Sequence, residues 1–188
     1  MKQELAPPQG FHYRDDALSP DEEQALVARF QALPFAPFDF HGFLGKRRIV
    51  SYGWRYDYGA DTVRESEPIA GFLLPLRERA ASLSGLCAGD LQQALVTEYP
   101  TGAPIGWHRD KPQFGEVLAF SFLSPCRLRL RRRNGKAWQR FAIELQPRSF
   151  YRMSGSARLE WEHSIPPVPA ERYSVTFRTF LGEAARAR

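Results

Sequence analysis

The amino-acid sequence predicts a mostly β (α+β) protein, a β-sandwich or jelly roll with N-terminal helices packed outside it. Residues 91–181 divide into short runs rich in β-branched and aromatic residues, and many of these runs alternate apolar with polar side chains. Turn-forming residues separate the runs, and Asn134–Gly135 between two alternating runs is a strong hairpin signal. The clear helical patterns lie before residue 91, so we expect the helices to cover a β-structure built from the second half.

Two amphipathic helices are expected in the first half of the chain. Ser19 can cap the first helix, Glu22 stands where a capping box requires an acid, and Pro34 ends the pattern. The second helix is expected to begin near Pro75 and to close at Gly85. The predicted core faces are Ala25, Leu26, Phe30 and Leu33 in the first helix and Leu76, Ala80 and Leu83 in the second.

Strand-like runs dominate the remainder of the chain. They span residues 91–99, 115–123, 126–133, 137–145, 148–154 and 172–181. No internal repeat is visible, and no linker divides the 188 residues, which are the length of one domain. The sequence therefore predicts a single domain, 1–188.

The composition favours an intracellular protein outside the membrane. Two cysteines, Cys87 and Cys126, do not make a disulfide framework, so a reduced, cytoplasmic setting is expected. No window is long and apolar enough to span a membrane, and the first ten residues lack the apolar run of a signal peptide. The formal net charge of +5 fits either a polyanionic partner or a basic solvated surface. We expect a monomer.

A histidine and an aspartate two residues apart are the first candidates for a metal site. His108 and Asp110 would point the same way on a strand and could hold one ion together. A facial triad of two histidines and one carboxylate needs one more histidine, from His12, His41 or His163. His163 lies among the later strands, although an ordinary hydrogen-bonded histidine is the alternative interpretation.

The last predicted strand carries an unusual polar face. Arg172 and Arg178 are six residues apart and would share one side of the strand with Ser174 and Thr176. Such a face suits a pocket for a dicarboxylate, because a guanidinium can donate two parallel hydrogen bonds to a carboxylate. An edge strand with solvent-facing arginines is the alternative. On the strand at 91–99 a second shared face is expected to consist of Leu95, Thr97 and Tyr99.

The joint order of these residues resembles the AlkB family of Fe(II)/2-oxoglutarate dioxygenases. The similarity covers about residues 90–181 and includes segment 149–167, which leads into the distal histidine. The matching positions are Tyr99, Gly102, Ile105, His108, Asp110, His163, Arg172 and Arg178. The resemblance implies a double-stranded β-helix, a jelly-roll variant, spanning 91–182. It also implies that 1–90 holds the outer helices and a substrate lid.

Roles for the site residues follow from this resemblance. It implies that His108, Asp110 and His163 bind Fe(II), and that Arg172 holds the remote carboxylate of 2-oxoglutarate. It further implies that Arg178 supports the keto-acid end and the metal ligands, and that Tyr99 contacts the cosubstrate. Thr97 and Ser174 stand where many members have Asn, and both keep hydrogen-bonding capacity. The implied reaction consumes O2 and 2-oxoglutarate, yields succinate and CO2, and hydroxylates a methyl group. If that methyl group is on nitrogen, the hydroxylated product breaks down and releases formaldehyde.

Substrate contacts are expected near the first half of the chain and beside the metal ligands. Tyr52, Trp54, Tyr56 and Tyr58 alternate, so we expect them on one side of a strand, either stacking on a flipped base or packing in a hairpin core. Further substrate candidates are Arg55, on the other side of that strand, and Arg109, between the metal ligands. Pro112 stands where DNA-repairing relatives often carry an acid, and this favours alkylated single-stranded DNA or RNA as the partner.

The predicted hairpin at 126–145 is strongly basic. Its inward side chains are expected to be Leu128 and Leu130, while phosphate contacts are expected from Arg129, Arg131 and Arg133. A solvated strand face protected against aggregation is the alternative. Other interpretations of the whole chain are the same chemistry on a protein side chain or small molecule, and a non-catalytic nucleic-acid-binding homologue. A zinc hydrolase would lack an obvious general base and would leave the arginine pair unexplained.

Overall fold

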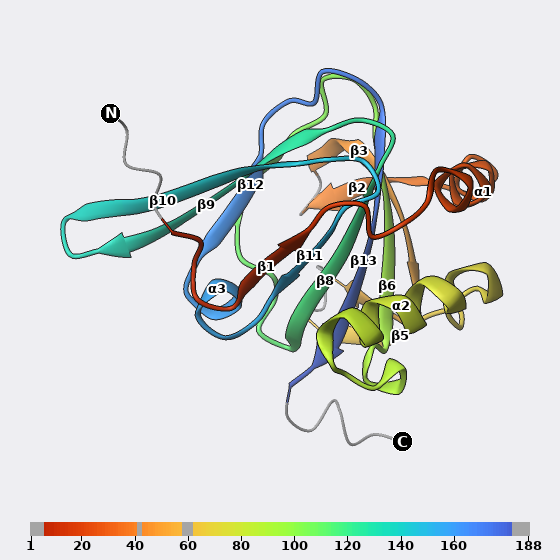
Figure 1. The fold of residues 1–188 in the computed structure, drawn as a ribbon, viewed down its shortest axis with the longest axis horizontal. Coiled ribbons are helices and arrows are strands. Elements are labelled where there is room, and N and C mark those ends of the chain that lie inside the picture. The colour runs from red at the N-terminus through yellow and green to blue at the C-terminus, as the bar shows by residue number, and fades with distance from the viewer. Residues whose placement is uncertain (1–5, 41–42, 58–61, 182–188) are drawn as a thin grey trace.

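The computed structural model describes residues 6–40, 43–57 and 62–181, and its core is two β-sheets that face each other (Figure 1). The large sheet has seven strands in the order β1-β11-β8-β13-β6-β3-β2, and the small sheet has four in the order β10-β9-β12-β7. Strands β4 and β5 form a separate hairpin. The antiparallel, double-sheet architecture confirms the predicted jelly-roll fold with helices outside it.

The element bounds are as follows. The strands are β1 (Phe11–Arg14), β2 (Ala36–Phe40), β3 (Phe43–Tyr52), β4 (Trp54–Asp57), β5 (Thr62–Glu65), β6 (Gln93–Tyr99), β7 (Ile105–His108), β8 (Phe114–Phe122), β9 (Cys126–Asn134), β10 (Ala137–Leu145), β11 (Phe150–Met153), β12 (Glu162–Ile165) and β13 (Arg172–Phe180). The helices are α1 (Pro20–Phe30), α2 (Leu74–Ser84), α3 (Gly155–Leu159) and the short 3-10 turns η1 (Gly71–Leu73) and η2 (Ala88–Asp90).

The strand-rich part of the chain begins earlier than the sequence pattern indicated. Strand β1 pairs with β11 at one edge of the large sheet. At the other edge, β3 pairs with β6 on one side and with the edge strand β2 on the other. The two outermost strands are short, and β2 contains Pro37, which an edge strand accommodates because one of its sides needs no ladder hydrogen bonds. Short, interrupted edge strands lack the alternation that reveals a central strand. The division of the domain at residue 90 stays a prediction.

Helix α1 has the predicted start but an earlier end. The Ser19 hydroxyl accepts from the Glu22 amide at 3.2 Å, and the Glu22 carboxylate accepts from the Ser19 amide at 2.8 Å, which confirms the capping box. The helix ends at Phe30, before Pro34. Two turns follow, in which the Leu33 amide donates to the Phe30 carbonyl and the Phe35 amide donates to the Leu33 carbonyl. Its buried side chains are Val27 and Phe30, so the prediction of Ala25 as a core residue was wrong.

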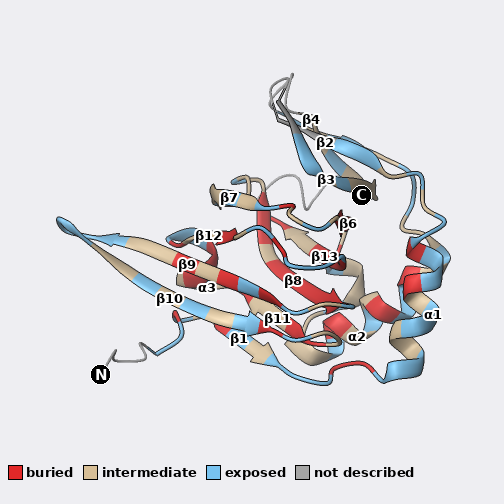
Figure 2. Cartoon of the chain, turned by 90° about the horizontal axis from the view of Figure 1, so that it is seen from above, coloured by how far each residue is buried: buried red, intermediate tan, exposed pale blue. Residues whose placement is uncertain are grey.

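Helices α1 and α2 cover the outer face of the large sheet (Figure 2). Phe30 is fully buried there, with its ring 5.0 Å from that of Phe122 and 5.7 Å from that of Tyr173. Removing such a ring from water stabilises the fold by roughly 1.5–3 kcal/mol. Helix α2 ends as predicted at Gly85, whose φ of 68° suits a residue without a Cβ. The helices therefore occupy one face of the sheet and leave the other face to the site.

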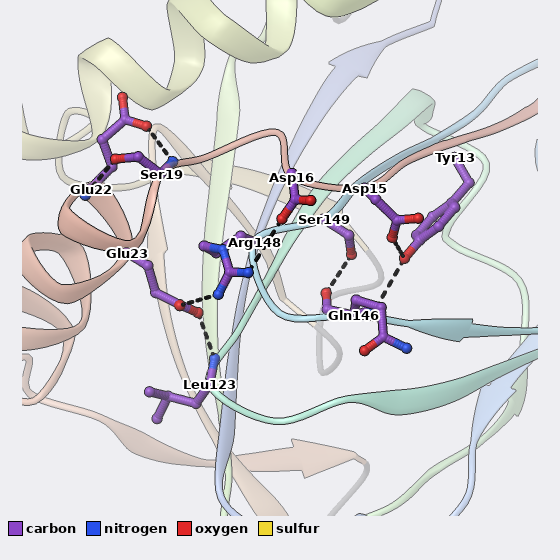
Figure 3. Close-up of polar contacts among 10 residues, drawn as sticks. All are labelled: Tyr13, Asp15, Asp16, Ser19, Glu22, Glu23, Leu123, Gln146, Arg148 and Ser149. Atoms are coloured by element: carbon purple, nitrogen blue, oxygen red, sulfur yellow. Dashed lines mark hydrogen bonds and ion pairs between the residues drawn. The ribbon is translucent and has the colours of Figure 1, made fainter.

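A polar network fastens the start of α1 to two turns of the β-structure (Figure 3). Glu23 accepts from the Leu123 amide at 2.9 Å and from the Arg148 guanidinium at 3.4 Å, and Arg148 also donates to Asp16 at 3.2 Å. Asp16, Leu123 and Arg148 all have positive φ, a conformation that costs non-glycine residues of order 1–3 kcal/mol each. These contacts offset that cost and fix α1 on the sheet.

The β9–β10 hairpin extends away from the body of the molecule, on the left of Figure 1. Asn134 pairs with Ala137, so the two-residue loop consists of Gly135 and Lys136, one position later than the predicted turn. Gly135 has a φ of 59°, as the first residue of such a tight loop requires. Within the described residues no helix is long and apolar enough to cross a membrane.

Candidate metal centre

A cavity of about 350 Å³ lies between the inner faces of the two sheets. Most of its lining residues come from β3, β6 and β13 of the large sheet and from β7 and β12 of the small sheet, with further residues from β4, β8, β9 and β11. Along the strands of the large sheet, side chains alternate between the face covered by the helices and the face that lines this space. On β13, for example, Tyr173, Val175 and Phe177 join the core under the helices, while the residues between them line the cavity.

Three of the predicted residues meet at one end of the cavity. Strands β7 and β12 pair so that His108 lies directly opposite His163, with ring centroids 4.2 Å apart. Asp110 follows the end of β7, and its carboxylate lies 3.6 Å from His108 Nε2 and 3.8 Å from His163 Nε2. One nitrogen or oxygen from each residue lies within 4.8 Å of the others, a spacing that can enclose a metal ion. The register of two adjacent strands thus brings together histidines that are 55 positions apart in the sequence.

Neighbouring groups hold these three side chains in place. His108 Nδ1 lies 2.9 Å from the Gly106 carbonyl, so a proton on Nδ1 leaves Nε2 available as a ligand atom. Arg178 Nε donates to Asp110 at 2.8 Å, and Arg178 Nη1 donates to Gln93 at 2.9 Å. The side chain of Asp110 is only 7% exposed, and Arg178 fixes which oxygen remains for an ion. Arg178 is therefore a positioning residue for the acidic ligand.

The protonation states suit metal binding. Although burial by itself raises the pKa of the Asp110 carboxyl, the Arg178 guanidinium and the two imidazoles hold that pKa well below its usual range. Burial, and next the neighbouring His108, lowers the pKa of His163 to about 3. At neutral pH the group is therefore one carboxylate and a neutral His163, the forms that coordinate a divalent cation.

The neutral His163, whose side chain is 12% exposed, makes a testable contribution to acid stability. Between pH 7 and pH 5 the unfolded chain protonates this residue while the folded chain does not, so the metal-free protein loses roughly 2 kcal/mol of unfolding free energy from it. Urea unfolding at both pH values should show a smaller loss in His163→Gln than in wild type. His12→Gln, at an exposed histidine, should keep the wild-type loss. An unchanged pH dependence in His163→Gln would contradict the assignment.

Arg172 forms the other end of the cavity. It is 1% exposed, its Nη2 donates to the Ser121 hydroxyl at 3.0 Å, and its guanidinium lies 4.4 Å from the centroid of the Tyr99 ring. Its Nε and Nη1 are buried without a hydrogen-bond partner among the described residues. Buried donors of this kind are costly unless a ligand accepts from them. A carboxylate, with two oxygens for two parallel donors, fits this arrangement.

The strand faces predicted to line a pocket do so. From β6, Leu95, Thr97 and Tyr99 face the cavity, and from β13 Ser174 and Thr176 lie between Arg172 and Arg178. Strands β6 and β13 are paired, with Ser174 opposite Thr97 and Arg172 opposite Tyr99. The two predicted faces therefore form one continuous wall.

Sequence reasoning missed several residues of this wall. Gln93, which supports Arg178, lies two positions before Leu95 on the same strand face, and the alternation along β6 could have found it. Tyr151 on β11 also lines the cavity, and burial raises the pKa of its phenol. Arg47, Ile49 and Ser51 line it from β3. No local signal in the sequence marks these last four residues, because strand pairing alone places them there.

The predicted row of lid aromatics is only partly correct. Gly53, with a φ of 74°, separates β3 from β4, so Tyr52 does not continue on the same strand as Trp54 and Tyr56. Tyr52 packs beneath the helices, and the Trp54 ring packs at 5.5 Å against Phe180. Tyr56 does line the cavity, where the Lys111 ammonium lies 4.4 Å from its ring centroid.

The remaining predicted residues lie at or outside the cavity. Arg109 lines it and donates to the Leu159 carbonyl at 3.3 Å, whereas Arg55 is exposed on β4. Leu128 and Leu130 are buried as predicted, and Arg129, Arg131 and Arg133 lie on the opposite face of β9. Tyr58 and His41 lie outside the described residues.

These features fit a particular pair of ligands. Two imidazoles and a carboxylate are the donor set of mononuclear iron sites that keep coordination positions open for other molecules. The unpartnered donors of Arg172, in the same cavity, fit the far carboxylate of a dicarboxylic acid whose other end reaches the metal. A single cavity therefore has the residues to hold both an iron ion and 2-oxoglutarate.

Comparisons with known proteins agree with this chemistry. Residues 16–178 match the model of the 2OG-Fe(II) oxygenase superfamily. The chain is 29% identical over 181 residues to an alkylated DNA repair protein ALKBH8 homolog of Arabidopsis thaliana, and this covers 84% of the chain and 51% of the relative. It therefore spans about half the length of that relative.

Two further proteins match this chain over most of their own lengths. An uncharacterized protein of Acanthamoeba polyphaga mimivirus is 25% identical over 192 residues, covering 94% of this chain and 88% of that protein. The solved structure of OsALKBH1 superposes with a TM-score of 0.72 at 16% identity, covering 94% of this chain and 99% of the other, and so shares its fold. The chain thus belongs to the 2OG-Fe(II) oxygenase superfamily, a family that uses Fe(II), 2-oxoglutarate and O2, and its His108, Asp110 and His163 form the candidate metal site.

Proposed function

We propose that this dioxygenase removes an alkyl group, most simply a methyl group, from a base of a nucleic acid and releases succinate, CO2 and formaldehyde. The observation that carries the proposal is the charge of the cavity. Its lining includes Arg47, Arg109 and Lys111 beside Arg172 and Arg178, and Asp110 is the single acid among the described lining residues. A cavity with this excess of cations suits a substrate that carries phosphates.

The aromatic ring at the cavity supports the same substrate class. Tyr56 offers a ring against which a base taken out of its stack can lie, with Lys111 on that ring. The Arabidopsis relative is called an alkylated DNA repair protein, and this name agrees with an alkylated base as substrate. Pro112 replaces an acid that many DNA-repairing relatives carry, so we expect single-stranded DNA or RNA to be preferred over duplex DNA.

Each part of the cavity has a defined task in this reaction. His108, Asp110 and His163 would hold the iron, Arg172 would hold the remote carboxylate of 2-oxoglutarate, and Arg178 keeps Asp110 oriented. When bound, the iron with 2-oxoglutarate and O2 supplies the oxidation that hydroxylates the methyl carbon. The hydroxymethyl group on nitrogen then leaves as formaldehyde, and the base regains its proton. Apolar side chains that exclude water from this space are Ile105, Phe114, Val117, Leu128 and Ile165.

A substrate panel tests the proposal directly. The iron-loaded protein, 2-oxoglutarate and a mixture of methylated single-stranded DNA, RNA and peptides are incubated, and loss of the methyl group is followed by mass spectrometry. We expect loss from an oligonucleotide and none from the peptides. Turnover of a methylated peptide without any turnover of nucleic acid would promote the alternative of a protein substrate.

Tyr56 provides a sharper prediction about the substrate end of the cavity. Base–aromatic stacking contributes about 1–3 kcal/mol, so Tyr56→Ala should lower kcat/KM for a methylated oligonucleotide by roughly five- to 150-fold. Succinate formation without the oligonucleotide should be unchanged, because the arginine and metal residues are untouched. Tyr56→Phe keeps the ring and should retain most activity. Equal activity in Tyr56→Ala and wild type would remove this residue from the substrate site.

A further inference from the structure

The outer face of the small sheet carries a stack of alternating arginine and tryptophan side chains that the cavity chemistry does not use. The order along the stack is Arg133, Trp138, Arg131, Trp107 and Arg129. The successive distances from guanidinium carbon to ring centroid are 4.5, 4.4, 4.2 and 5.0 Å. The stack begins near the tip of the projecting β9–β10 hairpin (Figure 1) and reaches β7 at Trp107, which lines the cavity next to His108; Arg129, on β9, also lies over that ring.

The stack continues past the residues at which β12 pairs with β9. Strand β12 pairs with β9 only over Glu162–Ser164 and Arg129–Arg131, so Arg133 and Trp138 lie on the hairpin past the end of that pairing. Trp138 belongs to neither apolar cluster of the described residues, whereas Phe141 and Ile143 on the other side of β10 pack into the core. A large aromatic residue that packs outside the core, mainly on arginines, suggests a function other than stability.

The charge of this face is strongly positive. Five arginines point outward from β9 and β10, and the acidic residues on the same face are Glu144 and, on the adjacent strand β12, Glu162. The arginines are Arg127, Arg129, Arg131, Arg133 and Arg140. Arg131 Nε donates to Glu162 at 2.7 Å and Arg129 Nε donates to Ser164 at 3.1 Å. Each guanidinium has five N–H donors, so these contacts fix the groups without using up their capacity.

The spacing of the guanidinium groups fits a repeating anion. Alternate residues on a strand are roughly 6.7 Å apart, a distance of the same order as that between neighbouring phosphates in an extended single strand. A guanidinium held close to an indole ring is restrained in position and still has free N–H donors, of which a phosphate can accept two. An acidic patch on a protein would not require such a regular row.

We propose that this face binds the sugar-phosphate backbone of a single-stranded nucleic acid and leads that strand across β9 and β12 to the cavity at β7. The inference rests on the proposed function, because it assigns the path of the strand whose base enters the cavity. Binding here is electrostatic and independent of sequence, and the two tryptophans hold the arginine side chains in their row.

Binding of an unmodified oligonucleotide tests this surface apart from catalysis. Fluorescence anisotropy of a short labelled single-stranded RNA is measured with the full chain over a range of salt concentrations, without added metal or cosubstrate. Arg131→Glu/Arg133→Glu should flatten the log–log salt slope by about 1.4, at roughly 0.7 for each phosphate contact. Arg14→Glu/Arg29→Glu removes the same charge from exposed positions on β1 and α1 and should leave the slope nearly unchanged.

A variant without a charge change separates the stack from general basicity. Trp138→Leu keeps every charge, yet loss of its cation–π contacts should weaken RNA binding by roughly three- to thirtyfold. Succinate formation without nucleic acid should stay at the wild-type level in all these variants, which also shows that they fold. Equal weakening by both double variants, or tight RNA binding in Trp138→Leu, would overturn the proposal.

The remaining outcomes separate this surface from the proposed function. Poly-glutamate that competes as strongly as RNA, and loses affinity equally in Trp138→Leu, would assign the face to an acidic protein and overturn the proposal. Loss of RNA binding in the stack variants, together with no demethylation of any oligonucleotide by wild type, would support the surface and contradict the reaction. Demethylation by wild type that is unaffected in the stack variants would support the reaction and contradict the surface.

Discussion

Replacing Asp110 by alanine is expected to abolish succinate formation and to weaken binding of a divalent metal at least about a hundredfold. Loss of groups that merely orient metal ligands typically costs about 10–100-fold, and loss of a direct ligand should cost more. Asp110 supplies the anionic oxygen of the three-residue group, and its pKa is held well below the usual range, so the carboxylate is fully charged at neutral pH. His108→Ala and His163→Ala should have the same effect on turnover.

Two further variants identify the cause of this loss. Alanine at position 110 also deprives Arg178 of its ion-pair partner, whereas Asp110→Asn keeps an oxygen that can accept from Arg178 and removes only the charge. Calorimetric titration with Mn(II) should show that both variants bind the metal weakly, while Asp90→Asn, at an exposed aspartate, binds it like wild type. Near-normal metal binding and turnover in Asp110→Ala would refute the metal assignment.

The residues that sequence analysis placed correctly share one physical property. The polar face of β13 was readable because side chains alternate along a strand, so Arg172, Ser174 and Arg178 share one face; the structure shows that this strand is central and that the face lines the cavity. The spacing of His108 and Asp110 is local in the same sense. Assigning His163 to the same site as His108 and Asp110 required the family resemblance, since no local pattern gives the register of β12 on β7.

The residues that were missed or misplaced depend on non-local or conformational information. Ser121, the hydroxyl partner of Arg172, reaches it only because β8 pairs with β13 with Ser121 opposite Ser174. The predicted aromatic row failed at Gly53, where a positive φ ends the strand and turns the following residues away. A glycine inside an alternating run was the available signal for that break. The cation–indole stack was likewise invisible, since its tryptophans come from different strands.

Replacing Arg172 by alanine should weaken 2-oxoglutarate binding by roughly two to three decades or more. Removing one partner of a buried charge pair costs roughly 3–5 kcal/mol, and each 1.4 kcal/mol is about tenfold in affinity. In the ligand-free protein the same change should cost much less stability, because Arg172 Nε and Nη1 are buried without partners there. The variant should therefore melt close to wild type without 2-oxoglutarate and should lose most of the stabilisation that the cosubstrate gives.

Thermal unfolding with and without 2-oxoglutarate, together with the KM for 2-oxoglutarate in succinate formation, measures both effects of the Arg172 substitution. Arg172→Lys keeps a charge but not the planar pair of donors, so its affinity should fall between those of wild type and Arg172→Ala. Arg14→Ala, at an exposed arginine on β1, should bind the cosubstrate like wild type. Equal and small effects on 2-oxoglutarate affinity at positions 14 and 172 would mean that the buried guanidinium does not hold the cosubstrate. Another anion would then have to accept from the unpartnered Nε and Nη1 of Arg172.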